Sequence, residues 1–473
     1  MVKRRDFIKT TGLLGTGFLL NQPLFASGFN DFVSRRPALD KRHFTSTAVE
    51  DTIAMLKKNI ANKELAWLFE NCFPNTLDTT VYYNEENAVP DTYIITGDID
   101  AMWMRDSTAQ VWPYLSLINK EDKLKKLVEG VIRRQSSYIL HDPYANAFYK
   151  DGQQESEWKS DKTNMKPGVH ERKWEIDSLC YPIRLAYHYW KATGDTSPFD
   201  EKWKESVRIT VKTFRQQQRK DNKGPYTFQR MTTQPLDTLT LGGYGNPVKP
   251  NGLICSSFRP SDDATTYPFL IPSNFFAVTS MRQASEMLTE IHKDYELGAL
   301  CIALSSDVSI ALKKYAIANH PVHGKIYAFE TDGFGNYLLM DDANVPSLLS
   351  MPYLGSVSAN DPVYINTRNF ILSSSNPYFF KGKYAEGIGG PHVALDMIWP
   401  LSIILRGLTS TNDTEIKKCL EMLIKTHGDT GFMHESFHKD DPRKFTRSWF
   451  AWANTIFGEF VLQVYRSKPH LLK

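Results

Sequence analysis

Three carboxylates stand in loops where acid–base chemistry could take place. Asp262 and Asp263 are adjacent in the segment SSFRPSDDATTYPFLIPSN, and Glu435 lies far along the chain in MHESF. Repulsion between neighbouring carboxylates raises the pKa of one of them, which suits a general acid. Hydrolysis of a glycosidic bond needs such an acid and a second carboxylate that serves as base or nucleophile. Asp262 or Asp263 is therefore a candidate acid, with Glu435 as the second carboxylate.

Polar residues beyond the needs of helix capping recur in five aromatic loops. Asp106 and Ser107 suit the N-cap of a following helix, which is an ordinary structural role. Five such loops that converge at one end of a fold would instead form a polar, aromatic pocket. Arg–carboxylate pairs suit the edges of sugars, and Trp rings suit their faces. The residues concerned are Asp98, Asp100, Trp103, Arg105, Trp174, Glu175, Asp177, Arg259, Asp262, Asp263, Asn274, His392, His434 and Glu435.

Between the loops, the hydrophobic pattern predicts helices of two alternating kinds. Runs that are apolar on all sides, as buried helices are, cover residues 106–117, 177–190, 274–287, 345–354, 392–405 and 449–465. More polar runs cover residues 48–70, 122–139, 200–217, 292–316, 361–371 and 413–425. Links that lead to a polar run are short, as in TGDTSP and TSTND, with Asp or Thr placed to cap the next helix. Links that lead to an apolar run are long, aromatic and acidic.

This alternation favours an all-α fold of the (α/α)6 barrel type, with buried helices in an inner ring and polar helices outside. The long loops then leave the barrel at one end. An open helical solenoid is the alternative, and the lack of self-similarity at a fixed period argues against it. The alternating stretches DTYIITG and KIYAFETDGFGNYLL predict short hairpins on the loops. We expect a single catalytic domain over residues 40–466.

The segment HESFH suggests a different chemistry, because it matches the HExxH pattern of zinc peptidases. That pattern needs His434 and His438 as ligands on one face of a sustained helix, with Glu435 as the base. A glycine stands shortly before the segment and KDDP follows it, so any helix would last barely two turns. The sequence therefore predicts no metal site here.

Two further motifs are weak evidence for a bound metal or nucleotide. DID at residues 98–100 resembles the DxD manganese motif of sugar-nucleotide transferases, but no doubly wound α/β pattern surrounds it. The segments DGFGN and GIGG lack the Lys and the strand-to-helix setting of a phosphate loop. No metal or nucleotide cofactor is expected.

The composition fits a large globular domain and argues against binding of nucleic acid. The chain has 473 residues, of which 41% are hydrophobic, so it can bury a large core. Its 56 basic and 53 acidic residues are mixed along the chain, with a net charge of +3 and no basic patch. The five cysteines are widely spaced without a CxxC pair, which predicts small core residues rather than a disulfide framework.

The first 26 residues resemble a targeting segment. Arg4 and Arg5 precede a short apolar stretch at residues 13–20, and small residues surround Ala26. Such a stretch is too short to span a bilayer. It predicts a cleaved export signal of the bacterial twin-arginine type and a periplasmic protein that no membrane holds after cleavage. A buried helix that opens the domain is the alternative.

The sequence resembles glycoside hydrolase family 125 over roughly residues 40–466. The segments that carry the resemblance are GDIDAMWMRDSTAQVWPYL, KWEIDSLCYP, SSFRPSDDATTYPFLIPSN, TDGFGNYLLMDDANVPSLL, GIGGPH and MHESF. Members of this family are bacterial metal-independent exo-α-1,6-mannosidases, inverting enzymes on an (α/α)6 barrel. The resemblance implies an exo-acting inverting α-mannosidase that acts on a mannose-containing oligosaccharide, such as an N-glycan or mannan fragment.

By this resemblance, the RPSDD loop supplies the general acid and Glu435 is the general base. We favour Asp262 as the acid, with Asp263 as a sugar-binding partner. The residues in motifs that would line the terminal-mannose pocket are Asp100, Trp103, Arg105, Asp106, Trp174, Asp177, Arg259 and His392, together with Asn274 and His434 in the same loops.

Three functions remain open on the sequence alone. The first is an exo-α-mannosidase. The second is a zinc peptidase that uses His434, Glu435 and His438, and activity that survives chelation would exclude it. The third is a non-catalytic periplasmic glycan-binding protein. A Glu435→Gln variant that still binds mannosides but has lost turnover would exclude this third function.

Overall fold

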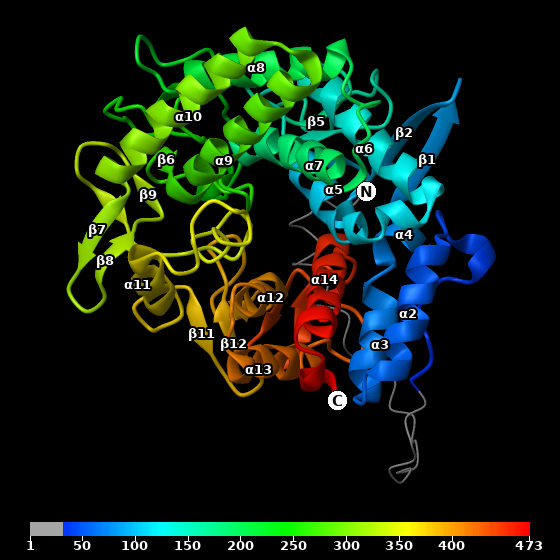
Figure 1. Cartoon of the computed structure of the whole chain (residues 1–473). Helices are drawn as coiled ribbons and strands as arrows, with labels where there is room; N and C mark the ends of the chain where they lie inside the picture. Colours follow the sequence, from blue (N-terminus) through cyan, green and yellow to red (C-terminus); the bar gives the residue numbers. More distant parts are fainter. Residues whose placement is uncertain (1–31) are drawn as a thin grey trace.

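The computed structural model describes residues 32–473 as helices arranged in two layers around a ring (Figure 1). The predicted export signal at residues 1–26 lies outside the described residues. A continuous hydrophobic cluster extends from Phe44 to Leu472 and joins the helices of both layers. All five cysteines are buried and free, which confirms their prediction as core residues.

The inner layer of the described chain contains α5 (Met104–Val111), α7 (Asp177–Thr193), α9 (Ile271–Met287), α12 (Pro400–Leu408) and α14 (Ala451–Ser467). Helix α14 packs between α12 and α5, and α7 packs between α5 and α9. Figure 1 shows these neighbours following one another around the ring. Most side chains of each inner helix are buried, as the apolar runs predict.

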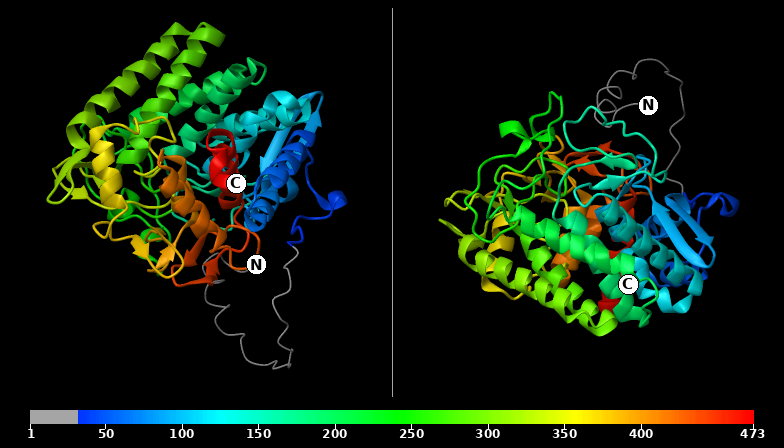
Figure 2. Two further views of the ribbon diagram at one scale, coloured as in Figure 1. Left: turned by 60° about the horizontal axis from the view of Figure 1, so that its bottom comes forward. Right: turned by 90° about the horizontal axis from the view of Figure 1, so that it is seen from above.

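The outer layer contains α2 (Thr47–Asn59), α3 (Lys63–Cys72), α6 (Asp122–His141), α8 (Glu201–Gln217), α10 (Tyr295–Tyr315), α11 (Pro362–Ile371) and α13 (Asp413–Ile424), and the short α4 (Asn75–Thr79) follows α3. Outer helices cover inner ones: α3 packs on α14, α6 on α7, α10 on α9 and α13 on α12. The right-hand view of Figure 2 shows the long loops gathered on one side of the helices.

Helices of the two layers begin differently. In six outer helices a polar side chain accepts a hydrogen bond from an N–H group of the first turn, as the short links predict. These caps are Ser46, Asn62, Asp200, Asp294, Asp361 and Asn412. The five inner helices have no side-chain cap, and α5, α12 and α14 follow Trp103, Trp399 and Phe450. Aromatic side chains therefore stand where capping residues would be expected.

Most of residues 345–354 are buried, but they do not form the predicted helix. They fold into successive turns instead. The carboxylate of Asp341 accepts hydrogen bonds from the backbone N–H groups of Leu348, at 2.8 Å, and Leu349, at 3.1 Å. Pro346 has no N–H group to donate within a helix. The apolar pattern thus indicated burial correctly but not the backbone conformation, because a buried carboxylate satisfies these donors.

Two other predicted helices have different bounds. The run at residues 48–70 is divided, because α2 ends at Asn59 and Asn62 caps a new helix, α3. The run at residues 392–405 becomes helical only at Pro400, a residue that suits the first turn of a helix. Just before it, Met397–Ile398 forms strand β13.

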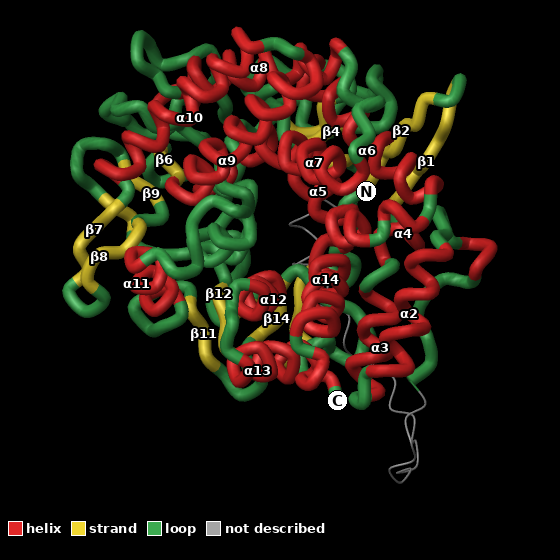
Figure 3. The backbone as a smooth tube through the Cα atoms, viewed as in Figure 1, coloured by secondary structure: helices red, strands yellow, loops and turns green. Residues whose placement is uncertain are grey.

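Short antiparallel sheets connect the loops (Figure 3). Two-stranded sheets are β1 (Val81–Glu86) with β2 (Val89–Ile94), β7 (Ile317–His320) with β8 (Gly324–Tyr327), and β11 (Phe379–Lys381) with β12 (Glu386–Ile388). The first three-stranded sheet contains β3 (Met102–Trp103), β4 (Ala147–Phe148) and β5 (Val169–Glu171). The second contains β6 (Phe269–Leu270), β9 (Glu330–Thr331) and β10 (Tyr337–Leu338). The third contains β13, β14 (Ser436–His438) and β15 (Asp441–Thr446). The first predicted alternating stretch begins in β2 of the β1–β2 hairpin, and the second runs from β8 through the β9–β10 hairpin.

Candidate active site

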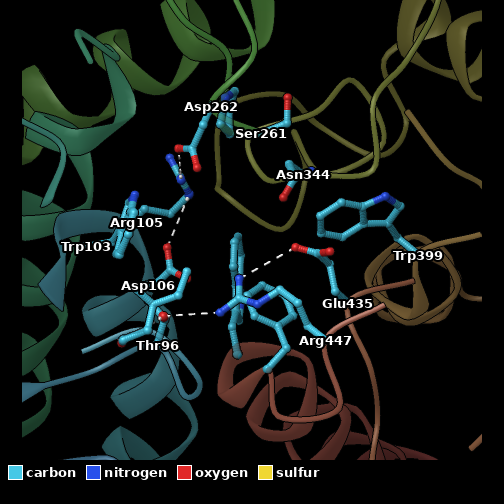
Figure 4. Close-up of a pocket in the computed structure, with 14 residues that line it drawn as sticks. Thr96, Trp103, Arg105, Asp106, Ser261, Asp262, Asn344, Trp399, Glu435 and Arg447 are labelled. Carbon is cyan, nitrogen blue, oxygen red and sulfur yellow. Dashed lines mark hydrogen bonds and ion pairs between the residues drawn. The ribbon is translucent and has the colours of Figure 1, made fainter. Parts of the chain in front are cut away.

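A narrow pocket lies among the loops at the N-terminal ends of α5, α12 and α14 (Figure 4). The space without protein atoms is about 330 Å³, part of which is open to solvent. Trp103, Trp399 and Phe450, the residues that precede these three helices, all line it. The absence of polar caps on these helices therefore places aromatic rings in the pocket wall.

Gly97 brings the segment before α5 into contact with the segment before α14. Its φ is 127°, and a Cβ atom at this position would lie 2.3 Å from the carbonyl oxygen of Trp449. Gly97 pairs with Phe450, and the N–H of Asp98 donates to the same Trp449 oxygen at 3.3 Å. Only glycine permits this conformation and this approach. The pairing holds Thr96 and Phe450 together in the pocket lining.

Asp262 occupies a strained turn in the pocket wall. Its φ of 66° lies in the left-handed region that non-glycine residues seldom adopt. The turn is closed by the N–H of Asp262, which donates to the Arg259 oxygen at 2.8 Å, and by the N–H of Arg259, which donates to the Asp263 oxygen at 2.7 Å. The Asp262 carboxylate accepts from Asn146 at 3.4 Å and Arg105 at 3.5 Å. Strain of this kind clusters at functional sites, where the surroundings fix the side chain.

The buried side chain of Lys173 fixes the backbone of the same turn. Its Nζ donates to the carbonyl oxygen of Asp262 at 2.9 Å and to the carboxylate of Asp237 at 2.8 Å. Burial opposes the charge of Lys173, but Glu171 and Asp237 outweigh it and raise its pKa. Lys173 therefore stays charged and anchors the strained peptide.

Arg105 gathers four carboxylates at the pocket. Its Nη1 lies 2.7 Å from Glu175 and 3.0 Å from Asp177, its Nη2 lies 3.5 Å from Asp262, and its Nε lies 3.6 Å from Asp106. Burial opposes the guanidinium charge, but the four carboxylates raise the pKa of Arg105 well above its ordinary value. Arg105 therefore stays charged and holds the side chains of its four acidic neighbours in place.

Glu175 makes the shortest contact with Arg105 in this corner, at 2.7 Å. It is fully buried, and burial raises its pKa well above the ordinary value, against the opposing charge of Arg105. The charge of Asp177 and a hydrogen bond with Asp262 raise this pKa further. Glu175 and Asp262 are therefore coupled through their shared neighbour Arg105.

Glu435 faces the pocket from the wall opposite Asp262 (Figure 4). It immediately precedes β14, which pairs with both β13 and β15. Nη1 of Arg447 lies 3.6 Å from the Glu435 carboxylate, and Nε of Arg447 donates to Asp98 at 2.8 Å. The sheet fixes the backbone of Glu435 and Arg447 orients its carboxylate, so Asp98 acts through Arg447.

Asp263 does not line the pocket. Its side chain is fully buried, and Nδ1 of His392 lies 3.0 Å from its carboxylate. His392 does not line the pocket either, and its ring centroid lies 6.2 Å from that of Trp399. The structure therefore separates the two adjacent acids, with Asp262 in the pocket and Asp263 behind it.

The predicted site residues fall into two groups. Those that line the pocket are Trp103, Arg105, Asp106, Asp262 and Glu435. Those that do not line it are Asp100, Asp263, Trp174, Asp177, Arg259, Asn274, His392 and His434. Asp106 is not the N-cap, because α5 begins two residues before it and places it in the first turn.

Trp174 and Asn274 are buried and act within the protein. Nε1 of Trp174 donates to the carbonyl oxygen of Cys255 at 2.7 Å. The Asn274 amide accepts from the N–H of Ile254 at 2.8 Å and donates to the carbonyl oxygen of Leu270 at 2.8 Å. These side chains are engaged with loop backbone and lie outside the pocket lining.

Three other predicted residues, Arg259, Asp177 and Asp100, either contact other protein groups or lie away from the pocket lining. Arg259 donates from Nε to Glu330 at 2.6 Å, and this pair anchors the loop that carries Asp262. Asp177 supports Arg105 from beneath the pocket. Asp100 is exposed to solvent outside the pocket lining. Arg259 and Asp177 position pocket residues rather than line the pocket themselves.

The segment HESFH does not have the geometry of a zinc peptidase. Ser436–His438 is a strand rather than part of a helix. The His434 ring stacks on Phe445 with centroids 3.7 Å apart, and its Nε2 lies 3.1 Å from the hydroxyl of Thr430. Burial lowers the pKa of His434 to about 4. Within residues 32–473, no group of three His, Cys, Asp or Glu side chains could hold a metal ion.

Sequence reasoning missed several residues that line the pocket. These are Thr96, Ile99, Pro260, Ser261, Asn344, Trp399, Arg447, Phe450 and Trp452. Ile99, Pro260, Ser261 and Asn344 lie within the segments quoted for the family resemblance, but their residue types did not single them out. A signal for Trp399 was present, because Pro400 directly after it suits the first turn of a helix.

Comparison with known proteins identifies the family. The family described as metal-independent alpha-mannosidase (GH125) matches residues 62–462. The chain therefore belongs to glycoside hydrolase family 125 and is a glycosidase. A solved Streptococcus pneumoniae metal-independent α-mannosidase, in a non-productive substrate complex with α-1,6-mannobiose, is 41% identical. The match covers 90% of this chain and 100% of that chain, with a TM-score of 0.86, so the helix-rich fold is that of a family member.

Two further relatives extend the comparison. The meiotically up-regulated gene 157 protein of Schizosaccharomyces pombe is 43% identical over 458 residues, which cover 93% of this chain and 90% of the relative. A relative this similar in a eukaryote shows that the likeness is not confined to bacteria, contrary to the expectation. A bacterial glucoamylase complexed with acarbose is 12% identical, with a TM-score of 0.51 over 79% of this chain and 50% of that chain. That likeness concerns the fold alone.

Proposed function

We propose that this family 125 glycosidase is an exo-acting, inverting α-mannosidase that releases terminal mannose from oligosaccharides, with a preference for α-1,6 linkages. The observation that carries the proposal is the placement of Asp262 and Glu435 on opposite walls of one pocket (Figure 4). The α-1,6-mannobiose bound to the Streptococcus pneumoniae relative supports the linkage. We refer to this space as the catalytic pocket.

In this proposal Asp262 is the general acid and Glu435 the general base. Asp262 gives its proton to the glycosidic oxygen as the bond from that oxygen to the anomeric carbon breaks. Glu435 takes a proton from a water molecule, whose oxygen attacks the same carbon from the opposite face. The attack inverts the configuration, so an α-mannoside yields β-mannose. Arg105 and Arg447 orient the two carboxyl groups.

Exo action is supported by the lining of the catalytic pocket, to which several separate segments of the chain contribute. Trp103, Trp399, Phe450 and Trp452 offer aromatic faces to that sugar. Asn344 and Asp106 offer polar groups to its hydroxyls.

We infer that the ring of helices is an (α/α)6 barrel in which residues 345–354 replace the sixth inner helix. This segment contacts inner helices through Arg184 of α7, which donates to the Tyr353 oxygen at 3.1 Å, and Glu459 of α14, which accepts from the Tyr353 hydroxyl at 2.9 Å. Tyr364 of the outer helix α11 donates to the Leu349 oxygen at 2.9 Å. These contacts suit a segment that fills the gap between α9 and α12.

A panel of mannobioses tests the function. Incubation with the α-1,2, α-1,3 and α-1,6 isomers should release mannose fastest from the α-1,6 isomer, and a Glu435→Gln variant serves as the control for turnover. From a polymeric mannan, mannose should appear one unit at a time. Early release of longer oligosaccharides would show endo action, and binding without hydrolysis would show a non-catalytic protein.

Export to the periplasm is part of the same proposal, on the basis of Arg4, Arg5 and the apolar stretch that follows them. Protein recovered from the native host should begin near Ser27. N-terminal sequencing that finds Met1 intact in the mature protein would contradict this.

A further inference from the structure

Asn344 contributes an amide group to one wall of the catalytic pocket. It stands two residues after the buried Asp342, in the segment that follows β10. This segment is fixed against the loop after β12, because the backbone N–H of Ala343 donates to the carbonyl oxygen of Gly389 at 3.0 Å. In Figure 4 the amide oxygen of Asn344 points toward the interior of the pocket.

The carboxylate of Asp342 determines which end of that amide faces the pocket. Oδ1 of Asp342 accepts a hydrogen bond from the backbone N–H of Asn344 at 3.0 Å, so this carboxylate oxygen is an acceptor. The amide atom of Asn344 that lies 3.2 Å from the same oxygen is therefore Nδ2, because only the NH2 end of an amide can donate. The carbonyl end of the amide is left for the pocket.

This carbonyl end, Oδ1 of Asn344, is open to a bound molecule. It has no hydrogen-bond partner within residues 32–473. It is not among the unpaired polar atoms that the surrounding protein closes off, so a molecule in the pocket can reach it. An amide oxygen accepts hydrogen bonds and cannot donate them. The group that satisfies it must therefore supply a proton.

Asp342 is itself held on several sides. Its Oδ2 accepts a hydrogen bond from the hydroxyl of Ser261 at 3.1 Å, and Ser261 directly precedes Asp262. A Cβ atom at Gly390 would lie only 3.2 Å from the carboxyl atoms of Asp342, so glycine lets the backbone pack closely against this group. The carboxylate cannot turn without losing these contacts, and the amide of Asn344 keeps one orientation.

We propose that Asp342 is a positioning residue for sugar recognition, which holds the Asn344 amide so that this wall of the catalytic pocket accepts a hydrogen bond and does not donate one. The sugar must then place a hydroxyl that donates against Asn344. The inference rests on the proposed function, because it takes the terminal mannose to occupy the catalytic pocket. It adds a selection by the direction of one hydrogen bond.

Fluorinated sugars test this direction. A hydroxyl group donates and accepts, fluorine can only accept, and hydrogen does neither. Methyl α-D-mannopyranoside and its monodeoxy and monodeoxyfluoro derivatives, changed at each hydroxyl in turn, serve as competitive inhibitors of the hydrolysis of an aryl α-mannoside. At one position fluorine and hydrogen should weaken inhibition equally, by roughly tenfold. At a hydroxyl that accepts from the protein, the fluoro derivative should bind better than the deoxy derivative.

An Asn344→Ala variant identifies the protein partner of that hydroxyl. It should bind the unmodified mannoside roughly tenfold more weakly, and removal of the hydroxyl at that position should then cause no further loss. Removal of the other hydroxyls should have the same effect as in the unaltered protein. Because this variant loses only a side-chain contact within its own segment, it keeps the inference testable if changes at Asp342 prevent folding.

Three changes at the neighbouring acids separate positioning from general structural damage. Asp342→Ala frees the amide of Asn344 to turn, so fluorine at the critical position should become better tolerated than hydrogen. Asp342→Asn keeps an acceptor oxygen for the amide and should preserve the original pattern. The matched control is Asp341→Ala, because Asp341 contacts the backbone N–H groups of Leu348 and Leu349 instead, and it should also preserve the pattern.

Failure of this inference can be distinguished from failure of the proposed function. If the aryl α-mannoside is hydrolysed but fluorine is better tolerated than hydrogen at every position, the inference is wrong and the function stands. An unchanged pattern in Asn344→Ala would have the same meaning. The same change of pattern in Asp341→Ala as in Asp342→Ala would show structural damage alone and would overturn the role of Asp342. A protein that neither hydrolyses nor binds any α-mannoside would overturn both.

Discussion

Asp262 and Asp263 are adjacent in the chain, yet only Asp262 reaches the catalytic pocket. Its φ of 66° turns the backbone so that its carboxylate meets Arg105 and Asn146, whereas the Asp263 carboxylate lies 3.0 Å from Nδ1 of His392. Lys173 holds the strained peptide through the Asp262 carbonyl oxygen. The acid of the reaction is therefore expected to be Asp262, with Asp263 in a supporting role.

Replacement of the two acids should have different effects that depend on the leaving group. Asp262→Asn removes the proton donor, so kcat/KM for mannobiose should fall by roughly 10²–10⁴-fold. The loss should be much smaller for an activated aryl mannoside, whose leaving group needs no proton. Rates measured on both substrates give the ratio that identifies the acid.

The matched variant is Asp263→Asn, which changes the contact with His392 but leaves the pocket carboxylates in place. Its effect should be similar on both substrates, because it acts through position rather than proton transfer. A leaving-group dependence in Asp263→Asn that exceeds the dependence in Asp262→Asn would exchange the two roles.

Local sequence signals predicted the layers of helices because each depends on neighbouring residues. Polar caps such as Asp200 and Asn412 start outer helices where the short links predict them. The run at residues 345–354 shows the limit of the pattern. Burial makes a segment apolar whether it is helical or not, and the carboxylate of Asp341 that replaces the helical hydrogen bonds lies outside the run.

The site was predicted less completely, because pocket lining depends on contacts between distant segments. The motif around Trp103 and Arg105 was recognisable by its density of charge. The direction of Asp263 away from the pocket depends on His392, more than a hundred residues later. His434 resembled a ligand in the sequence, but its stacking on Phe445 follows from the β14–β15 pairing.

Activity should not depend on a metal ion. His438 contacts the backbone N–H of Asp440 through Nδ1 at 3.2 Å and belongs to a strand, so a His438→Ala variant should keep its rate within about twofold. Activity should also persist in excess EDTA. The measurement pairs mannobiose hydrolysis before and after dialysis against EDTA with elemental analysis of the purified enzyme. A stoichiometric zinc content that tracks activity would contradict this prediction.

Stability should fall as pH rises through the range where Glu459 loses its proton. The half-buried Glu459 accepts hydrogen bonds from the hydroxyl of Tyr353 at 2.9 Å and from Nε1 of Trp112 at 3.1 Å. Burial raises its pKa to about 7, against the opposing charge of Arg184. Between the unfolded value of about 4.3 and this value, only the folded state holds the proton. The stabilisation is therefore full below pH 4.3 and is lost as pH rises toward 7.

A Glu459→Gln variant tests this linkage, since a neutral amide oxygen still accepts one of the two hydrogen bonds and does not titrate. Its Tm should change less between pH 5 and pH 7.5 than the Tm of the unaltered protein. The difference should correspond to no more than about 3 kcal/mol in the free energy of unfolding. The same slope of Tm against pH in both proteins would show that Glu459 does not control this range.

The stereochemistry of the product should identify Glu435 as a base rather than a nucleophile. A base needs room for a water molecule between itself and the sugar, so the carboxyl groups of Glu435 and Asp262 should lie about 6.5–9.5 Å apart in a complex with a mannoside, against roughly 5–5.5 Å for a retaining pair. Proton NMR during the first minutes should then show β-mannose before mutarotation mixes the anomers.

Glu435→Gln removes the base and should reduce turnover by roughly 10²–10⁴-fold even for substrates with good leaving groups, because attack by water is needed whatever group departs. This contrasts with Asp262→Asn, which activated substrates should rescue.

Arg447, which orients Glu435 at 3.6 Å, supplies an intermediate case. Arg447→Lys keeps the charge but not the guanidinium geometry and should lower kcat less than Glu435→Gln does. Initial release of α-mannose, or a sugar covalently attached to Glu435, would make Glu435 the nucleophile of a retaining enzyme and would overturn the assignment.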